Sequence, residues 1–127
     1  LFTTVISLAG GQIPTDRLID GMDLSPVLFG TGSSPRETMA YYRMGELFAF
    51  RQGSYKAHFV TEGRYGLPPL RTDHNPPLLF NLDEDPGELF DIASTHPDVL
   101  TSILAEVFRH RTNLTIGDPL FDSRETP

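Results

Sequence analysis

Two side chains that could act together on an anionic group lie close in the sequence. Lys56 and His58 fall within a segment rich in aromatic and β-branched residues, which predicts a β-strand. Residues two apart on a strand project from the same face, so an ammonium group and an imidazole would be neighbours. The alternative interpretation is that Lys56 pairs with an acidic neighbour and that His58 packs into a domain interface.

A second group of candidate side chains lies in the connection from Thr61 to Pro77, which is rich in glycine and proline. Loops longer than about 12–15 residues inside compact domains are usually functional or disordered. Loops at the edge of a site often select among ligands, so we expect His74, with Glu62, Arg64 and Tyr65, to form part of a rim. The alternative is that His74 is merely solvated.

An acidic segment follows, with Asp83, Glu84, Asp85 and Glu88 within six residues. A hard cation needs several converging carboxylate oxygens, but this order has neither the length nor the glycine placement of a calcium loop. We therefore predict a turn in which Asp85 acts as a cap and Pro86-Gly87 supplies the backbone angles. No metal ligand is assigned to this segment.

The composition excludes several classes of protein. The chain has 127 residues, which suits one modest domain, and its net charge of −7 argues against a nucleic-acid surface. Its positive charges are one lysine and scattered arginines rather than a basic stripe. The absence of cysteine removes disulfides, thiolate nucleophiles and cysteine-bound zinc. No apolar stretch approaches the length of a membrane span.

The local patterns predict an α+β fold. Three strands with hairpin-sized connections should form an antiparallel meander, a fourth strand should follow, and a long C-terminal helix should begin at Pro97 and cover one face of the sheet. The expected ranges are 38–43, 47–51, 55–60 and 78–82 for the strands and 97–111 for the helix.

The expected core follows from hydrophobic periodicity. Aromatic residues at a spacing of two on strands suit a half-buried sheet face, and a stripe at helical spacing suits the face of the helix that packs on the sheet. The sheet residues expected in the core are Phe48, Phe50, Phe59 and Phe80. The helix stripe is Val99, Leu100, Ile103, Leu104, Val107 and Phe108.

The expected organisation has three parts. Residues 1–9 have the pattern of a helix end, stopped by Gly10-Gly11, so we expect the segment to begin inside a larger protein. Residues 1–32 are then the end of a large-domain helix and a connecting loop with one short helical turn. Residues 33–112 form the folded subdomain, and residues 113–127 form a coil tail.

Three stretches, in order, resemble the C-terminal region of the arylsulfatases, in the branch of arylsulfatase A and the galactosamine sulfatases. They are residues 19–28 (IDGMDLSPVL), 51–59 (RQGSYKAHF) and 76–88 (PPLLFNLDEDPGE). The resemblance implies an enzyme of the alkaline-phosphatase-like superfamily with a large α/β domain. Its smaller C-terminal subdomain would be a four-stranded antiparallel sheet packed against one long C-terminal helix.

The resemblance also implies a catalytic apparatus outside this segment. In this family a Cys or Ser in a C/S-x-P-S-R motif becomes formylglycine, and carboxylates and an amide hold calcium or magnesium. The segment Ser33-Ser34-Pro35-Arg36 has proline after serine rather than before it, so it is not that motif. The sulfate-binding lysine and histidine of the family come from the large domain, so no catalytic residue is assigned to this chain.

The resemblance therefore predicts the C-terminal part of a sulfatase that hydrolyses sulfate esters when complete. Lys56, His58, Glu62, Arg64, Tyr65 and His74 are its candidate rim residues. Its partners would be the N-terminal sulfatase domain, a sulfate-ester substrate and a second copy of the chain, in a secreted, periplasmic or lysosomal setting. Two alternatives stay open: a free-standing structural or binding module derived from a sulfatase, and part of a related phosphodiesterase or phosphonate hydrolase.

Overall fold

A computed structural model describes residues 1–65, 67–115 and 117. The chain forms two compact units, which divide between Glu37 and Thr38 and are described separately. The expected boundary at residue 32 stays a prediction, and most of the expected tail, 113–127, lies outside the described residues. No helix in the described part of the chain is long and apolar enough to cross a membrane.

The first unit contains two short helices, α1 (Phe2–Leu8) and α2 (Ser25–Leu28). The end of α1 at the Gly10-Gly11 pair is confirmed, since Gly10 adopts a φ of 71°, which favours glycine. The Thr4 hydroxyl ties α1 to the segment before α2: it donates to the Met22 carbonyl (3.3 Å) and accepts from the Leu24 N–H (3.0 Å). The expected single helical turn in this loop is α2.

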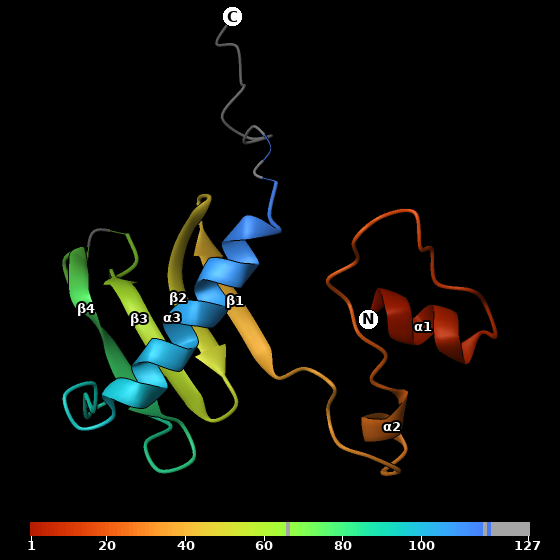
Figure 1. The fold of residues 1–127 in the computed structure, drawn as a ribbon, viewed down its shortest axis with the longest axis horizontal. Coiled ribbons are helices and arrows are strands. Elements are labelled where there is room, and N and C mark those ends of the chain that lie inside the picture. The colour runs from red at the N-terminus through yellow and green to blue at the C-terminus, as the bar shows by residue number, and fades with distance from the viewer. Residues whose placement is uncertain (66, 116, 118–127) are drawn as a thin grey trace, which may run out of the picture. The chain divides into compact units, whose positions relative to one another are not determined.

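The second unit is built on one antiparallel sheet with strand order β1-β2-β3-β4 (Figure 1). Its strands are β1 (Thr38–Arg43), β2 (Glu46–Gln52), β3 (Tyr55–Thr61) and β4 (Thr72–Asn81). Met44 and Gly45 connect β1 to β2 with φ angles of 49° and 80°, and positive φ at both positions defines the tight turn that suits a twisted hairpin. The predicted α+β fold is confirmed.

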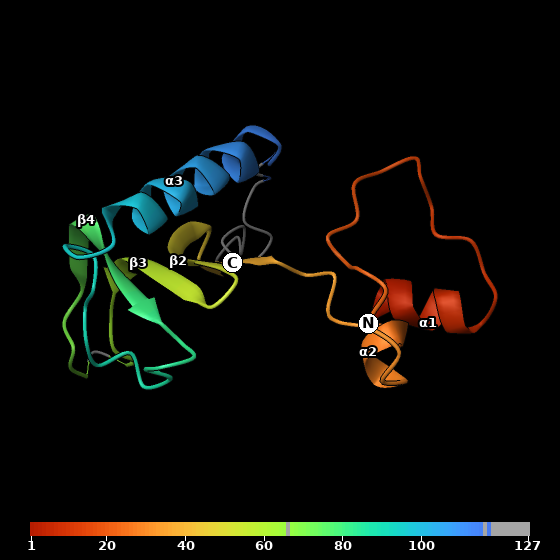
Figure 2. The same cartoon turned by 60° about the horizontal axis from the view of Figure 1, so that its bottom comes forward.

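A single helix, α3 (Pro97–Thr112), covers one face of this sheet (Figures 1 and 2). The core between them joins sheet residues Leu47, Phe50, Ala57 and Leu79 to helix residues Leu100, Ile103 and Val107. The predicted helix stripe is thus confirmed at its centre. It is wrong at its edge: Leu104 is 41% exposed and Phe108 is 73% exposed.

Strand β4 is twice as long as expected, because it begins at Thr72 rather than Leu78. Two prolines interrupt the sequence pattern, but β4 is an edge strand, where proline removes no essential ladder hydrogen bond. Both prolines also fall where the register with β3 shifts, since Leu78 pairs with His58 and Asp73 pairs with Val60. The connection between β3 and β4 therefore spans only residues 62–71.

Phe48 does not share a face with Phe50, contrary to the expected alternation. The β1–β2 register shifts by one residue, because Tyr41 pairs with Ala49 while Tyr42 pairs with Leu47. The extra residue is Phe48, and a bulge of this kind reverses the faces on either side of it. Phe50 packs under α3, whereas Phe48 contacts the Arg43 guanidinium, 5.6 Å from its ring centroid.

The buried centre of α3 should control stability. Ile103→Ala removes a fully buried side chain and should lower the free energy of unfolding by about 2–5 kcal/mol. The matched control is Leu104→Ala on the exposed edge of the same helix, which should cost about 1 kcal/mol or less. Urea denaturation of both variants measures the difference, and equal losses would contradict this assignment of the core.

Candidate functional site

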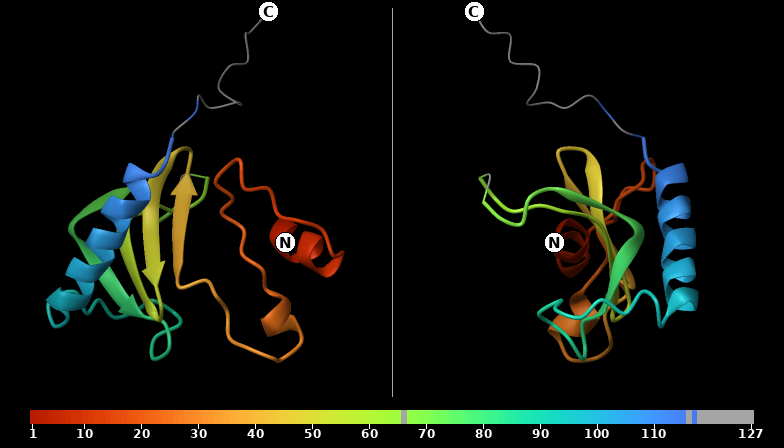
Figure 3. Two further views of the ribbon diagram at one scale, coloured as in Figure 1. Left: turned by 45° about the vertical axis from the view of Figure 1, so that its right-hand side comes forward. Right: turned by 90° about the vertical axis from the view of Figure 1, so that its left-hand side faces the viewer.

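The face of the sheet opposite α3 carries a cluster of three charged or titratable side chains. Lys56 and His58 both project from β3 on this face, as their spacing predicts, and the segment between β4 and α3 reaches it from one end of the sheet (Figure 3). Glu88 in that segment bridges them: its Oε1 accepts from Lys56 Nζ at 2.6 Å and its Oε2 lies 2.7 Å from His58 Nε2. Lys56 thus pairs with an acidic residue, as the alternative interpretation expected.

A tight turn aims Glu88 at the sheet. The Asp85 carboxylate accepts hydrogen bonds from the backbone N–H groups of Leu89 (2.7 Å) and Phe90 (2.8 Å), so its expected capping role is confirmed. Pro86 and Gly87 occupy the two central positions of this turn, as expected, because the Glu88 N–H donates to the Asp85 carbonyl at 3.1 Å, and Glu88 itself has a positive φ of 54°. Non-glycine residues adopt this conformation rarely, and here it points the carboxylate toward β3.

Two aromatic rings complete the surroundings of the cluster. The ammonium of Lys56 lies 4.7 Å from the ring centroid of Tyr41, within the range of a cation–π interaction. The imidazole of His58 meets the ring of Phe80 nearly edge-on, with centroids 5.6 Å apart at 84°. Phe80 is therefore buried as expected, but on the face opposite α3. The lysine charge is held between a carboxylate and an aromatic ring.

The protonation states follow from these contacts. Burial lowers the pKa of His58, and the nearby Lys56 adds to this effect, although the Glu88 carboxylate opposes it. Burial alone would raise the pKa of Glu88, but the hydrogen bond and charge of Lys56, together with His58, outweigh it and hold that pKa below its usual value. The cluster is thus an ionised glutamate, a charged lysine and a neutral histidine.

The neutral imidazole must carry its proton on a defined nitrogen. An ionised carboxylate only accepts hydrogen bonds, so His58 Nε2 is the donor to Glu88. The other nitrogen, Nδ1, is then an acceptor. With its charges matched, the cluster is suited to fixing the segment that carries Glu88 against β3, and Lys56 is poorly placed to bind a further anion.

Three of the six candidate rim residues line one hollow of about 260 Å³ on this face. They are Lys56, His58 and Glu62, with walls formed in part by Phe48 and Pro69. Glu62 is paired with Arg43 across the sheet, at 2.8 Å between Oε2 and Nη1. The hollow therefore presents a mixed polar and aromatic surface.

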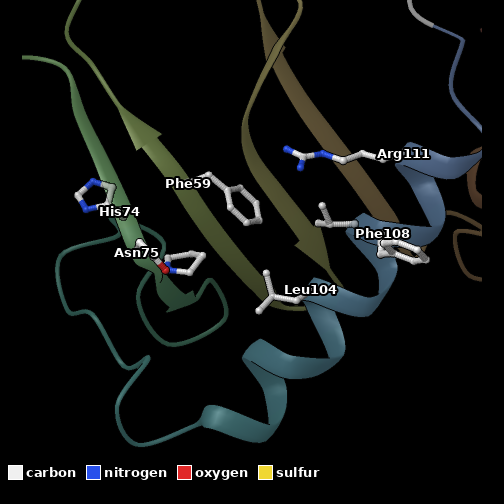
Figure 4. A pocket seen from close by; sticks show the side chains of 8 residues that line it. Phe59, His74, Asn75, Leu104, Phe108 and Arg111 are labelled. Carbon is white, nitrogen blue, oxygen red and sulfur yellow. The ribbon is translucent and has the colours of Figure 1, made fainter.

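The other three candidates lie elsewhere. Arg64 and Tyr65 are exposed on the 62–71 connection, and Tyr65 is 95% exposed. His74 lies 2.9 Å from the Thr61 hydroxyl and lines a second hollow, against α3 (Figure 4). The structure therefore divides the predicted rim residues between two hollows and one exposed connection.

Close backbone packing shapes that connection. The Gly63 N–H donates to the Pro69 carbonyl at 2.6 Å, and a Cβ on Gly63 would lie only 2.0 Å from the Leu67 carbonyl oxygen. Glycine is therefore required there by the close approach of two backbone segments. The base of the connection is closed, and Arg64 and Tyr65 lie at its outer end.

The acidic segment 83–88 does not fit a calcium or magnesium site. Asp83 accepts from the Ser54 hydroxyl, Asp85 caps the turn, and Glu88 is held by the cluster, so these carboxylates face different partners. A hard cation requires such oxygens to converge. Within residues 1–65, 67–115 and 117, no group of three or more His, Asp or Glu side chains could hold a metal ion.

Comparison with known proteins places this arrangement in a family. The family model for the C-terminal region of aryl-sulfatase matches residues 34–127. An arylsulfatase of Hemicentrotus pulcherrimus is 37% identical over 97% of this chain and 27% of its own length. Arylsulfatase A of Bos taurus is 42% identical over 84% of this chain and 24% of its own length.

A solved structure supports the fold independently. The PsFucS1 sulfatase of Pseudoalteromonas sp. superposes with a TM-score of 0.73 at 23% identity, covering 90% of this chain and 26% of that one. The chain therefore belongs to the sulfatase family, as its C-terminal region. It spans about a quarter of the length of the curated relatives it matches.

Sequence reasoning did not single out Glu88 as the partner of Lys56 and His58. It lies 32 residues after Lys56 and follows three other acidic residues, all of which are equivalent on composition alone. The available signal was the need of a half-buried lysine for a counter-charge, but this need does not say which carboxylate fulfils it.

Loss of the Glu88 charge should destabilise the fold. Glu88→Gln leaves Lys56, whose side chain is only 16% exposed, without its counter-charge, so unfolding should become easier by about 1–3 kcal/mol. Glu84→Gln, a charge-matched change at an exposed position in the preceding turn of the same segment, should alter the free energy of unfolding by less than about 0.5 kcal/mol. Chemical denaturation compares them, and a similar effect of both changes would exclude a stabilising role for the cluster.

Acid should weaken the fold through the same cluster. The folded chain holds the pKa values of His58 and Glu88 below their ordinary ones, so the unfolded chain binds protons more readily. The free energy of unfolding should therefore begin to fall below about pH 6.5, where the unfolded chain protonates the histidine. It should fall further below about pH 4.5, where the unfolded chain protonates the glutamate.

The variant His58→Gln tests the histidine part of this dependence, because it keeps a neutral N–H donor for Glu88 but does not titrate. Its free energy of unfolding should fall less than that of the parent chain between about pH 7 and pH 5. Glu84→Gln retains the cluster and should follow the parent. If the free energy of unfolding falls equally with pH for the parent chain and for His58→Gln, then His58 does not contribute to the pH dependence of stability.

Proposed function

We propose that this chain is the supporting subdomain of a sulfatase that hydrolyses sulfate esters when complete, and that it encloses part of an active site built by the rest of the enzyme. The match to the C-terminal region of aryl-sulfatase carries the proposal, together with coverage of only a quarter of each relative. Alone, the chain would have no turnover.

The geometry of the cluster favours a structural role over binding of the substrate's sulfate group. Lys56 and His58 are the candidate side chains that could attract a sulfate group on this face, and both are engaged by Glu88. A lysine whose charge is already matched contributes little to binding another anion. The pair therefore acts by fixing the segment 82–91 against the sheet.

The side of the sheet opposite α3 is the proposed contact with the catalytic part. The 62–71 connection and the first part of the 82–96 segment project from this side, and the 82–96 segment then crosses to the start of α3 (Figure 3). Large apolar side chains lie on them in the open: Leu89 is 75% exposed and Phe90 70%, and Leu67 and Leu70 are also exposed. Clusters of exposed apolar side chains commonly mark surfaces that are covered in an assembly.

The rest of the enzyme would supply the chemistry. In the proposed complete enzyme, formylglycine would supply the covalent nucleophile and a calcium or magnesium ion would supply positive charge for the sulfate oxygens, both held by residues outside this chain. The residues of this chain would hold the hollow bounded by Lys56, His58 and Glu62 in shape. The outer end of the 62–71 connection, with Arg64 and Tyr65, and His74 on β4 would meet the part of the substrate beyond the sulfate.

An activity measurement tests the proposal directly. Purified chain should hydrolyse a chromogenic aryl sulfate no faster than buffer. A protein that joins this chain to the catalytic part of the proposed enzyme should show turnover. In the joined protein, Tyr65→Ala should alter KM for some sulfate esters more than for others. Turnover by the isolated chain, after rigorous removal of contaminating enzymes, would overturn the proposal.

The exposed apolar surface gives an independent readout in the same experiment. The double change Leu89→Ser and Phe90→Ser should reduce binding of a hydrophobic dye by the isolated chain and should lower the activity or yield of the joined protein. Met44→Ser, at an even more exposed position on the β1–β2 turn, is the control and should leave both dye binding and activity unchanged.

A further inference from the structure

One short motif lies outside the surfaces described so far. Asn113, Leu114 and Thr115 form an Asn-x-Thr tripeptide in which x is not proline, which is the acceptor pattern for N-linked glycosylation. The other two asparagines of the chain, Asn75 and Asn81, have no serine or threonine two residues later and so lack the pattern. Because a tripeptide of this kind also occurs by chance, its meaning depends on where the fold places it.

The motif begins where α3 ends. Asn113 is the C-terminal cap of the helix, and its N–H is shared between the carbonyls of Arg109 (3.3 Å) and His110 (3.2 Å). Leu114 and Thr115 follow outside regular secondary structure, and all three residues of the motif are exposed. None of them belongs to the core beneath α3. The tripeptide can therefore enter the site of a modifying enzyme without disturbing the sheet or the core.

The side-chain amide of Asn113 is held in a way that is compatible with modification. Its Nδ2 donates a hydrogen bond to the Arg109 carbonyl at 3.1 Å. A side-chain amide nitrogen carries two N–H groups, and attachment of a sugar replaces only one of them. The glycosylated nitrogen can therefore still donate to Arg109 and cap the end of α3, while the sugar takes the place of the second hydrogen.

We propose that Asn113 is an N-glycosylation site when the chain is made in a cell that attaches such glycans to secreted proteins. The sugar donor is an oligosaccharide joined through pyrophosphate to a membrane lipid. A bond forms between Asn113 Nδ2 and the anomeric carbon of the first sugar, and the bond from that carbon to the pyrophosphate oxygen breaks. The nitrogen loses one proton and the lipid pyrophosphate leaves. The product is a bulky, polar group at the C-terminal end of α3.

The place of the motif suits a surface that stays in solvent. The helix α3 covers one face of the sheet, whereas the proposed contact with the catalytic part of the enzyme uses the opposite face (Figure 2). A glycan at the end of α3 would therefore leave that contact free. The inference rests on the motif and on its exposure, and it does not depend on the proposed enzymatic function.

Intact mass spectrometry tests the site. The 127-residue chain, made in animal cells behind a cleavable secretory leader, should carry one glycan on most molecules. Treatment with peptide-N-glycosidase should remove this glycan and leave an aspartate at position 113, which peptide mapping locates. Loss of the leader shows in the same spectrum that the chain entered the compartment where glycans are attached. Chain that has lost its leader but carries no glycan on Asn113 would overturn the proposal.

Two variants of Thr115 separate use of the motif from an effect on folding. Thr115→Ser keeps the acceptor pattern and should retain the glycan, whereas Thr115→Ala removes the pattern and should lose it. Both changes lie outside the core, and circular dichroism verifies that the sheet and α3 remain folded in each. A glycan that persists on Thr115→Ala would show that the motif is not what directs the modification, and it would overturn the proposal equally.

Discussion

One carboxylate contacts two neighbouring side chains of β3, and this contact fixes the segment that covers the face of the sheet opposite α3. Glu88 joins Lys56 and His58 across 32 and 30 residues of chain, and these contacts fix the segment that leads into α3. Because a half-buried lysine needs a counter-charge, the turn around Asp85 must present Glu88 in a conformation that glycine would adopt more easily. One face of the sheet is thus held by charge and the other by the apolar core beneath α3.

Local signals were sufficient to predict much of the fold. The Met44-Gly45 turn and the proline at the start of α3 are short-range features, and both lie where the sequence indicates. The spacing of Lys56 and His58 likewise places them on one face, because side chains alternate along any regular strand. These predictions depend on a few neighbouring residues and therefore need no knowledge of tertiary contacts.

The remaining features depend on contacts between distant residues. The bulge at Phe48 and the start of β4 at Thr72 are set by strand register, which a single strand pattern does not specify. The choice of Glu88 among four acidic residues depends on which turn faces β3. The separation of His74 from the other rim candidates follows from the register shift opposite Pro76-Pro77. In the sequence, these prolines appear only as an interruption of the strand pattern.

The outer edge of β4 has a consequence for association between molecules. Pro77, two residues before Leu79, offers no N–H group there, and the Leu79 N–H donates to the Asp91 carboxylate while the Leu79 carbonyl accepts from the Ile92 N–H. An incoming strand from another chain would find these donors and acceptors missing or already used. The sheet is therefore protected at this edge from growing by strand addition, a common first step toward aggregation.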